Sequence, residues 1–188
     1  MIDRIKVVNN FLPDHTFKDL LQVVESEQFY WRWQNHSTPG DNKFKFGKVI
    51  FTDSSLSGEK GYVDNNLMPL FQVFVEYQIA EDTKTYNTQK LLKMKLNLYP
   101  NEGKQVQHGT HKDIVDKDSN DVDSVITTSV FNFHTSNGYT CIGKEKVPSV
   151  ANQIVIFNQQ EHYGVTQSDI PRRIVLNMNV SIYEETNK

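Results

Sequence analysis

Residues 90–100 read KLLKMKLNLYP, and this segment decides which fold the chain predicts. Every second residue is apolar and the residues between are polar or aromatic: Leu92, Met94, Leu96 and Leu98 alternate with Lys93, Lys95, Asn97 and Tyr99. Successive side chains of a strand point to opposite faces of a sheet. The segment therefore predicts a strand with one apolar face and one polar face.

The same two-residue period returns near the C-terminus, over residues 173–183. One predicted face carries apolar residues and the other is mainly polar: Ile174, Leu176, Met178, Val180 and Ile182 against Arg173, Val175, Asn177, Asn179 and Ser181. Shorter apolar runs predict further strands at about 125–133, 139–142 and 153–157. The second half of the chain is thus expected to form antiparallel sheet.

Helical spacing of apolar residues occurs only in the first half of the chain. We expect Asp14 to cap a helix after Pro13, because apolar residues follow at helical spacing: Phe17, Leu20, Leu21 and Val24. A second helix is predicted at about 64–80, with one face made by Leu67, Leu70, Phe71, Phe74 and Tyr77. Residues 37–48 are rich in Gly, Pro, Asn and Asp and predict a loop.

Two helices followed by many short strands indicate an α+β fold. We expect the apolar faces of the two long strands to lie under the helices and their polar faces to line a wet cavity. A β-barrel or jelly roll with a polar interior is the simplest such architecture. The 188 residues predict one domain over 1–188, with a helical N-terminal part at about 1–85 and a β core at about 90–183.

Composition excludes several classes of protein. The net charge is −3 and only four arginines occur, which is a weak electrostatic basis for binding nucleic acid. No apolar run approaches the roughly 18 residues of a membrane helix, and the polar start of the chain shows no secretory signal. The single cysteine rules out a disulfide framework and fits a reducing compartment, so we expect a cytoplasmic protein.

The segment His108-Gly109-Thr110-His111-Lys112-Asp113 carries the first candidate metal ligands. In an extended segment His111 and Asp113 project to the same side, and His162 is a third candidate. Two imidazoles and one carboxylate leave the opposite positions of a metal open, which suits Fe(II) enzymes that bind a co-substrate and dioxygen there. The alternative interpretation is a surface turn with a solvated His and Asp.

An organic-acid co-substrate needs a cation near the metal, and an arginine offers a planar fork to a carboxylate. Arg173 shares the polar face of the last strand, whereas Arg172 shares the apolar face and would extend outward. The same reasoning puts Asn97 and Tyr99 in the cavity, where Tyr99 could hydrogen-bond the acid. The alternative for each is an ordinary strand residue at a barrel rim.

Seven segments resemble one enzyme family, in the family's order. They are LNLYP at 96–100, HKD at 111–113, TT at 127–128, NGYT at 137–140, VPSVANQIVIF at 147–157, HYGV at 162–165 and RIVLN at 173–177. In these segments the chain resembles the 2-oxoglutarate/Fe(II)-dependent oxygenases. It is most similar to their prolyl-hydroxylase-like branch and its small phage-encoded members, for which the compartment would be the host cytoplasm.

The resemblance implies a double-stranded β-helix core with flanking helices. It implies Fe(II) held by His111, Asp113 and His162, and 2-oxoglutarate bound to the metal and to Arg173, with ascorbate as a supporting reductant. Many relatives place a tyrosine in the strand around residue 131, where this chain has Phe131. The resemblance therefore leaves the second co-substrate contact to Tyr99 or to Thr127, with Asn97 beside them. Since Asp113 keeps the carboxylate, halogenation is disfavoured.

The function predicted from the sequence is an oxygenase that converts 2-oxoglutarate to succinate and CO2 while it uses dioxygen to oxidise, by hydroxylation, an organic substrate. A peptidyl side chain is the first expectation for that substrate, a small metabolite the second and nucleic acid the third. Two alternatives stay open. One is a non-catalytic jelly-roll binding module with a structural or vestigial metal site, and the other is a cupin-type metal enzyme that does not use 2-oxoglutarate.

Overall fold

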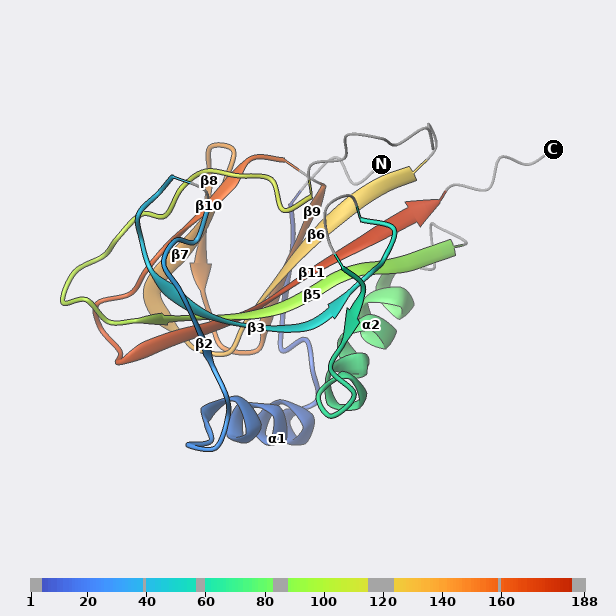
Figure 1. Ribbon diagram of the computed structural model, residues 1–188, viewed down its shortest axis with the longest axis horizontal. Helices are drawn as coiled ribbons and strands as arrows, with labels where there is room; N and C mark the ends of the chain where they lie inside the picture. The colour runs from blue at the N-terminus through green and yellow to red at the C-terminus, as the bar shows by residue number, and fades with distance from the viewer. Residues whose placement is uncertain are drawn as a thin grey trace.

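Two antiparallel sheets and two helices make up the computed structural model (Figure 1). It describes residues 5–38, 40–56, 60–82, 88–114, 124–158 and 160–183. The main sheet has the order β1-β9-β6-β11-β5-β3-β2, with β4 paired to β3, and the small sheet has the order β10-β7-β8. No helix in the described ranges is both long and apolar enough to cross a membrane.

The strands and helices have the following bounds. The main-sheet strands are β1 (Lys6–Asn9), β2 (Arg32–Gln34), β3 (Lys45–Thr52), β4 (Tyr62–Val63), β5 (Thr88–Pro100), β6 (Ser124–Asn132), β9 (Gln153–Asn158) and β11 (Arg172–Tyr183). The small-sheet strands are β7 (Ser136–Ile142), β8 (Glu145–Ser149) and β10 (His162–Val165), and the helices are α1 (Asp14–Glu25) and α2 (Met68–Asp82).

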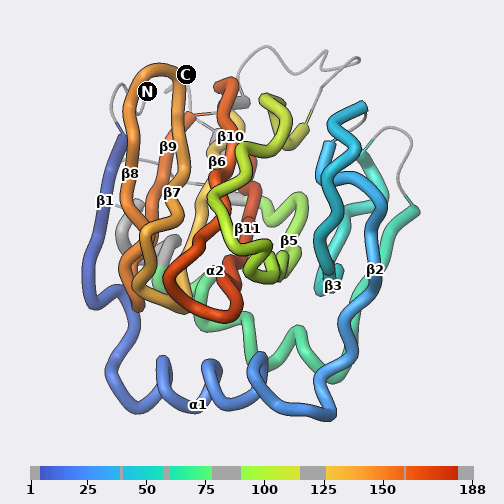
Figure 2. Tube along the Cα trace, turned by 90° about the vertical axis from the view of Figure 1, so that its left-hand side faces the viewer, coloured from blue at the N-terminus to red at the C-terminus, as the bar shows by residue number. Residues whose placement is uncertain are grey.

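The two helices lie on one side of the long strands β5 and β11, and the small sheet lies on the other (Figure 1). Figure 2, turned by 90°, shows α1 running along the bottom of the view between the β1 and β2 ends of the main sheet. The apolar core fills the space between helices and sheet. Its fully buried members include Phe71 and Phe74 of α2, Met94 and Leu96 of β5, and Leu176 and Met178 of β11.

The two-faced long strands predicted from the sequence are present. β5 and β11 pair along their whole length, and Arg173, Val175, Asn177 and Asn179 face away from the helices into a cavity. One irregularity was not predicted. The register shifts between Asn179 and Val180, so Leu91 rather than Leu92 packs against the helix core. A bulge of this kind adds one residue to a strand and reverses the alternation beyond it.

Both predicted helices are present, but their first residues, the N-cap of α1 and part of the buried face of α2 differ from the prediction. α1 begins at Asp14, but Pro13 occupies the N-cap position without a side-chain cap, and Asp14 instead pairs with Lys18 at 2.6 Å. α2 begins at Met68 and not at residue 64. The Asp64 carboxylate accepts the backbone N–H of Leu67 at 3.1 Å and so closes the turn before the helix. Leu70 and Tyr77, expected on the buried face, are 45% and 37% exposed.

The N-terminal part, expected to be helical, also contains β1 to β4. β3 overlaps the end of the predicted loop 37–48, and Lys45 and Gly47 are buried within it. β3 obtains its hydrogen bonds from β5, to which Phe46 and Gly47 pair opposite Leu98 and Asn97. Strand formation there depends on a partner more than forty residues away, which local composition does not reveal.

Candidate functional site

A cavity of about 440 Å³ lies on the polar face of the main sheet. Strands β3, β5, β6 and β11 supply one wall, and β7 and β10 of the small sheet supply the opposite one. Six of the seven candidate site residues line it: Asn97, Tyr99, His111, Asp113, His162 and Arg173. The double-faced strands β5 and β11 thus carry half of these side chains.

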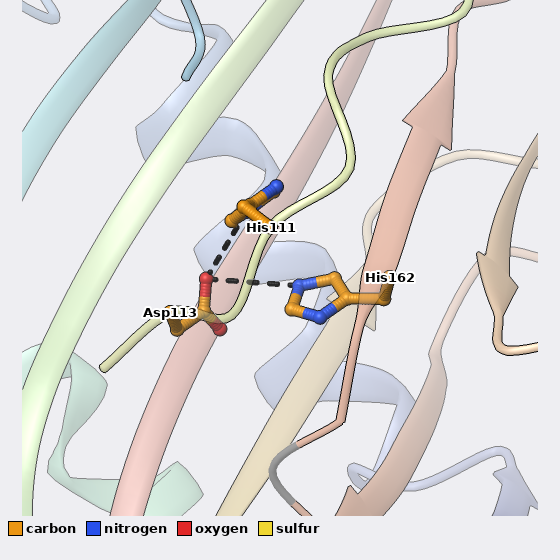
Figure 3. A group of neighbouring side chains, drawn as sticks. All are labelled: His111, Asp113 and His162. Atoms are coloured by element: carbon orange, nitrogen blue, oxygen red, sulfur yellow. Dashed lines mark ion pairs between the residues drawn. The ribbon is translucent and has the colours of Figure 1, made fainter. Parts of the chain in front are cut away.

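Backbone pairing brings the two candidate histidine ligands together. His111, in the segment after β5, and His162, at the start of β10, exchange two backbone hydrogen bonds of 3.0 Å. Asp113 Oδ1 lies 3.4 Å from His111 Nε2 and 3.7 Å from His162 Nε2 (Figure 3). One ligand atom of each residue lies within 4.8 Å of the others, which is a spacing that one metal ion can bridge.

Hydrogen bonds assign the tautomer of both imidazoles. His111 Nδ1 lies 3.0 Å from the Gly109 carbonyl, and His162 Nδ1 lies 3.0 Å from the Gln160 carbonyl. A carbonyl oxygen only accepts, so both Nδ1 atoms donate, and in the neutral form of each ring the lone pair is then on Nε2, on the side of Asp113. His162 Nε2 is buried and has no hydrogen-bond partner among the described residues. These donor atoms fit a divalent cation that also has open positions.

A hydrogen bond from Asn179 orients the carboxylate of Asp113. Its second oxygen, Oδ2, accepts a hydrogen bond from Asn179 Nδ2 at 3.2 Å, and Asn179 also donates to Thr128 Oγ1 at 3.1 Å. Burial by itself raises the pKa of Asp113, but the adjacent His111 and His162 rings, when protonated, outweigh burial and lower the pKa below its ordinary value. Asp113 is therefore ionised, as a metal ligand must be.

Arg173 is a buried cation with no carboxylate partner among the described residues. Only 2% of it is exposed. Its guanidinium donates to polar groups on four sides: Ser149 Oγ at 3.2 Å, the Val165 carbonyl at 3.4 Å, Asn132 Oδ1 at 3.2 Å and Thr140 Oγ1 at 3.3 Å. Burial lowers the pKa of Arg173 to about 10, so it stays charged at neutral pH. A buried guanidinium held this firmly, on a cavity wall, is suited to binding an anion.

The neighbouring arginine points elsewhere. Arg172 is exposed, and its Nη2 atom lies 3.1 Å from Glu25 Oε1 of α1. The structure therefore puts Arg173 in the cavity and Arg172 on the outside, as the alternation of the last strand predicts.

Tyr99 and Asn97 lie beside Arg173 on the adjacent strand. Tyr99 pairs opposite Arg173, whose Cζ atom is 6.0 Å from the tyrosine ring centre. Burial raises the pKa of Tyr99 to about 12, so its hydroxyl remains a donor. Asn97 donates to Asn177 Oδ1 at 3.4 Å, while its own Oδ1 is buried and has no partner among the described residues.

Thr127 does not line the cavity. It is fully buried and its hydroxyl donates to the Val180 carbonyl at 3.4 Å. Alternation along β6 gives it the same side as Phe131, which packs in the helix core, whereas Val130 lines the cavity. The absence of a hydroxyl at Phe131 is therefore immaterial to the cavity, and the threonines that line it are Thr140 of β7 and Thr38.

Sequence reasoning missed a cluster that closes one side of the cavity. Asp41 accepts hydrogen bonds from the Ser37 hydroxyl, from Ser37 N at 3.1 Å and from Gly109 N at 3.2 Å. These donors hold the pKa of Asp41 below its ordinary value although burial opposes them. Since Asp41 only accepts, the Ser37 hydroxyl donates to it and in turn accepts from His108 Nδ1 at 2.8 Å.

Because His108 Nδ1 donates to Ser37, His108 Nε2 is left as a buried acceptor on the cavity wall. His108 is 3% exposed, and its Nε2 atom carries a lone pair but has no hydrogen-bond partner in the described part of the chain. Burial lowers the pKa of His108 to about 4, so the ring is neutral near pH 7. No sequence motif marks this cluster, because Ser37 and Asp41 come from a segment that the sequence describes only as loop.

Lys45 is the second cavity residue that the sequence did not indicate. It is 7% exposed, lines the cavity from β3, and its Nζ atom is 5.8 Å from the centre of the Tyr99 ring. It was missed because its segment was predicted to be loop. The alternation of β3 with β5, visible only after folding, turns it inward.

Comparison with known proteins shows the fold. No protein-family model matches the chain, and no curated protein matches its sequence. A viral collagen prolyl hydroxylase from Paramecium Bursaria Chlorella virus-1, solved with 2-oxoglutarate, superposes with a TM-score of 0.59 at 13% identity, over 94% of this chain and 95% of that one.

Two further solved structures are similar. A 2OG-Fe(II) oxygenase family oxidoreductase from Burkholderia pseudomallei has a TM-score of 0.63 at 10% identity, covering 94% of this chain and 85% of its own. A prolyl hydroxylase from Trichoplax adhaerens, in complex with a hypoxia inducible factor peptide, has a TM-score of 0.61 at 13% identity, covering 96% and 84%. The double-stranded β-helix fold predicted from the sequence is therefore confirmed.

Proposed function

We propose that this chain is a 2-oxoglutarate- and Fe(II)-dependent oxygenase. One observation carries the proposal: a buried guanidinium without a carboxylate partner in the described residues, Arg173, shares one cavity with three converging metal-ligand atoms. Neither the guanidinium nor the set of metal ligands would indicate this chemistry alone. A dicarboxylic keto acid can bind the metal with its keto-acid end and the guanidinium with its other carboxylate, and the fold is that of enzymes that use this co-substrate.

The bound Fe(II) would supply the activation of dioxygen, coupled to loss of CO2 from 2-oxoglutarate and formation of succinate. His111, Asp113 and His162 would hold the metal on one side and leave the side toward the cavity open. Arg173 would bind the distal carboxylate of 2-oxoglutarate, and the Tyr99 hydroxyl, unshared among the described residues, would add a second hydrogen bond. Asn179 would keep the Asp113 carboxylate in orientation.

A non-catalytic module with structural zinc has less support. Such sites use four protein ligands, whereas only three His, Cys, Asp or Glu side chains converge in the described part of the chain. A cupin-type enzyme without 2-oxoglutarate would leave the buried charge of Arg173 without an anionic partner.

For the organic substrate, we place a peptidyl side chain first, a small metabolite second and nucleic acid third. The peptide is supported by the two prolyl hydroxylases of similar fold, one of them viral and the other bound to a peptide. The same neighbours support placing the chain in the prolyl-hydroxylase-like branch, and its similarity to phage-encoded members rests on the sequence motifs alone. We infer the cytoplasm, or host cytoplasm for a viral protein, from the single cysteine.

The test is release of succinate from 2-oxoglutarate in the presence of Fe(II) and dioxygen, measured by mass spectrometry with peptide and metabolite pools. We expect turnover in the wild-type protein and a loss of at least about 100-fold in His111→Ala and Asp113→Ala. A well-folded protein that binds neither Fe(II) nor 2-oxoglutarate would end the proposal. Incorporation of one oxygen atom into a pool component would identify the substrate.

A further inference from the structure

Lys45 is a buried ammonium for which the proposed chemistry has no use. It lies on the cavity wall at 7% exposure, and it has no ion pair or hydrogen bond within the described residues. Its one close contact is the face of Tyr99, at 5.8 Å from the ring centre. Burying an amine without an acceptor is costly, and here burial lowers the pKa of Lys45 to about 8, against the opposing charges of Asp113 and Asp41.

Lys45 and Arg173 occupy separate places on the wall. Strands β11, β5 and β3 are adjacent, and Arg173 pairs opposite Tyr99 on the neighbouring strand. The β3–β5 register places Lys45 beside Tyr99 on its other side. With strands about 4.8 Å apart, the two backbones are separated by about 10 Å. The head groups approach the Tyr99 ring between them, with Arg173 Cζ 6.0 Å and Lys45 Nζ 5.8 Å from its centre.

The proposed metal and co-substrate leave Lys45 unmatched. Fe(II) with the Asp113 carboxylate, and dianionic 2-oxoglutarate with Arg173, together carry no net charge. Lys45 lines the same cavity as His111, Asp113 and His162. Asp113 and Asp41 attract this ammonium, but neither forms an ion pair or hydrogen bond with it within the described residues. An anion brought in by another molecule would make that contact.

We propose that Lys45 binds an anionic group, a carboxylate or a phosphate, of the substrate to be oxidised. This inference rests on the proposed function and narrows its substrate class to molecules or side chains that carry an acidic group into the cavity. The ammonium donates to the anion, and the neutral His108 Nε2 on the same cavity accepts from any N–H or O–H beside it. The contact with Tyr99 keeps the lysine stem against the wall.

The experiment uses Mn(II) as an oxygen-inert paramagnetic stand-in for Fe(II). Binding of Mn(II) and then 2-oxoglutarate is first measured by calorimetry, so failure of the proposed function is seen before any anion is added. Acetate and inorganic phosphate are then titrated in turn, and the Mn(II)-induced relaxation of acetate protons and phosphate phosphorus is recorded. If 2-oxoglutarate does not bind, the same titration of the Mn(II) protein still tests Lys45.

We expect saturable relaxation in the wild-type protein for at least one anion, and at least tenfold weaker affinity in Lys45→Met. Lys45→Arg should stay within about threefold of wild type, since it keeps the charge. Lys43→Met is the matched control. Lys43 carries the same charge and is two residues from Lys45, but it does not line the cavity. Response to acetate alone indicates a carboxylate substrate, and response to phosphate alone indicates a phosphorylated one.

Three results would overturn the inference. They are equal anion affinity in wild type and Lys45→Met, no saturable relaxation with either anion, and a loss of 2-oxoglutarate affinity in Lys45→Met as large as in Arg173→Leu. The last would assign Lys45 to the co-substrate. Lys45→Gln serves as a second variant if Lys45→Met does not fold, and thermal unfolding of each variant is measured first.

Discussion

Arg173 shows how a single side chain combines two roles. Its guanidinium bonds to Ser149, Asn132 and Thr140 of three different strands, so it connects the main sheet to the small sheet. The same bonds hold the charge on the cavity wall, where no carboxylate neutralises it among the described residues. A group that is buried, charged and immobile before the ligand arrives loses little entropy on binding.

Replacing Arg173 by Leu should weaken 2-oxoglutarate binding by about 100-fold, because a buried charge pair is lost. Arg172→Leu is the matched control, since it removes an exposed arginine that contacts only Glu25 among the described residues. Calorimetric titration of the Mn(II) protein measures both. Equal affinities in the two variants would mean that the anion site lies elsewhere.

His108 should make stability depend on pH. Its pKa is lowered by burial from 6.5 to about 4 in the folded protein. As the pH falls below 6.5, the unfolded chain takes up a proton that the folded protein excludes, so the free energy of unfolding decreases. The loss should reach roughly 2–4 kcal/mol between pH 6.5 and 4.

Urea unfolding at several pH values measures this effect. His108→Gln should lack this part of the pH dependence, because an amide does not titrate in this range. His36→Gln removes an exposed histidine of the preceding loop and should keep the wild-type profile. If His108→Gln lost as much stability on acidification as wild type, the assignment of the effect to His108 would be wrong.

Among the elements, β5 and β11 decide how the cavity is lined. Their two-residue period places apolar side chains under α1 and α2 and polar ones in the cavity. A slip of one residue in either strand would exchange the two faces, so burial of the apolar face also fixes which polar groups enter the cavity. The bulge opposite Asn179 and Val180 adds Leu92 to β5 and so interrupts the alternation of β5 there, while β11 continues it with Val180 in the helix-side core.

In the small sheet, Gly138 of β7 permits a close approach to the neighbouring elements. A Cβ atom at this position would lie 3.0 Å from the Val165 carbonyl oxygen and 3.2 Å from Arg173 Cδ. Gly138→Ala should therefore push β7 away and destabilise the protein by about 1–3 kcal/mol.

Gly164→Ala provides the comparison, because its Cβ would meet only Arg173 Nη1, at an ordinary 3.9 Å. Denaturant unfolding should show a clearly smaller loss for this variant. A Gly138→Ala protein as stable as wild type would show that β7 can shift without cost.

At the scale of the whole molecule, the candidate metal site joins parts that pack separately. One apolar cluster lies between the helices and the main sheet, and a second, which includes Ile142 and Val147, lies between the main and small sheets. His162 belongs to the small sheet, whereas His111 and Asp113 follow β5. A metal bound to all three would stabilise the relative position of the two sheets.

Mn(II) with 2-oxoglutarate, each at about 100 times its dissociation constant, should stabilise the fold by about 2.7 kcal/mol for each bound ligand. For a chain of this length, one such increment corresponds to a rise in Tm of roughly 5–10 °C. Scanning calorimetry with and without a chelator measures it. Asp113→Ala should show little of the rise, and an undiminished rise in that variant would place the ion at another site.

The sequence by itself determined the two-faced strands and the order of H-x-D, distal His and downstream Arg, and the alternation of the last strand favoured Arg173 over Arg172 as the arginine facing the cavity. These features are local, because alternation and spacing are written in consecutive residues. Only the tertiary structure decided the rest. It brought His111 and His162 together through backbone pairing, turned Thr127 away from the cavity, and carried Lys45 and His108 into it, with Asp41 bonded to Ser37 behind them. Those positions depend on which distant strand or segment each residue pairs with or packs against, and the local alternation of residues does not predict such long-range pairing.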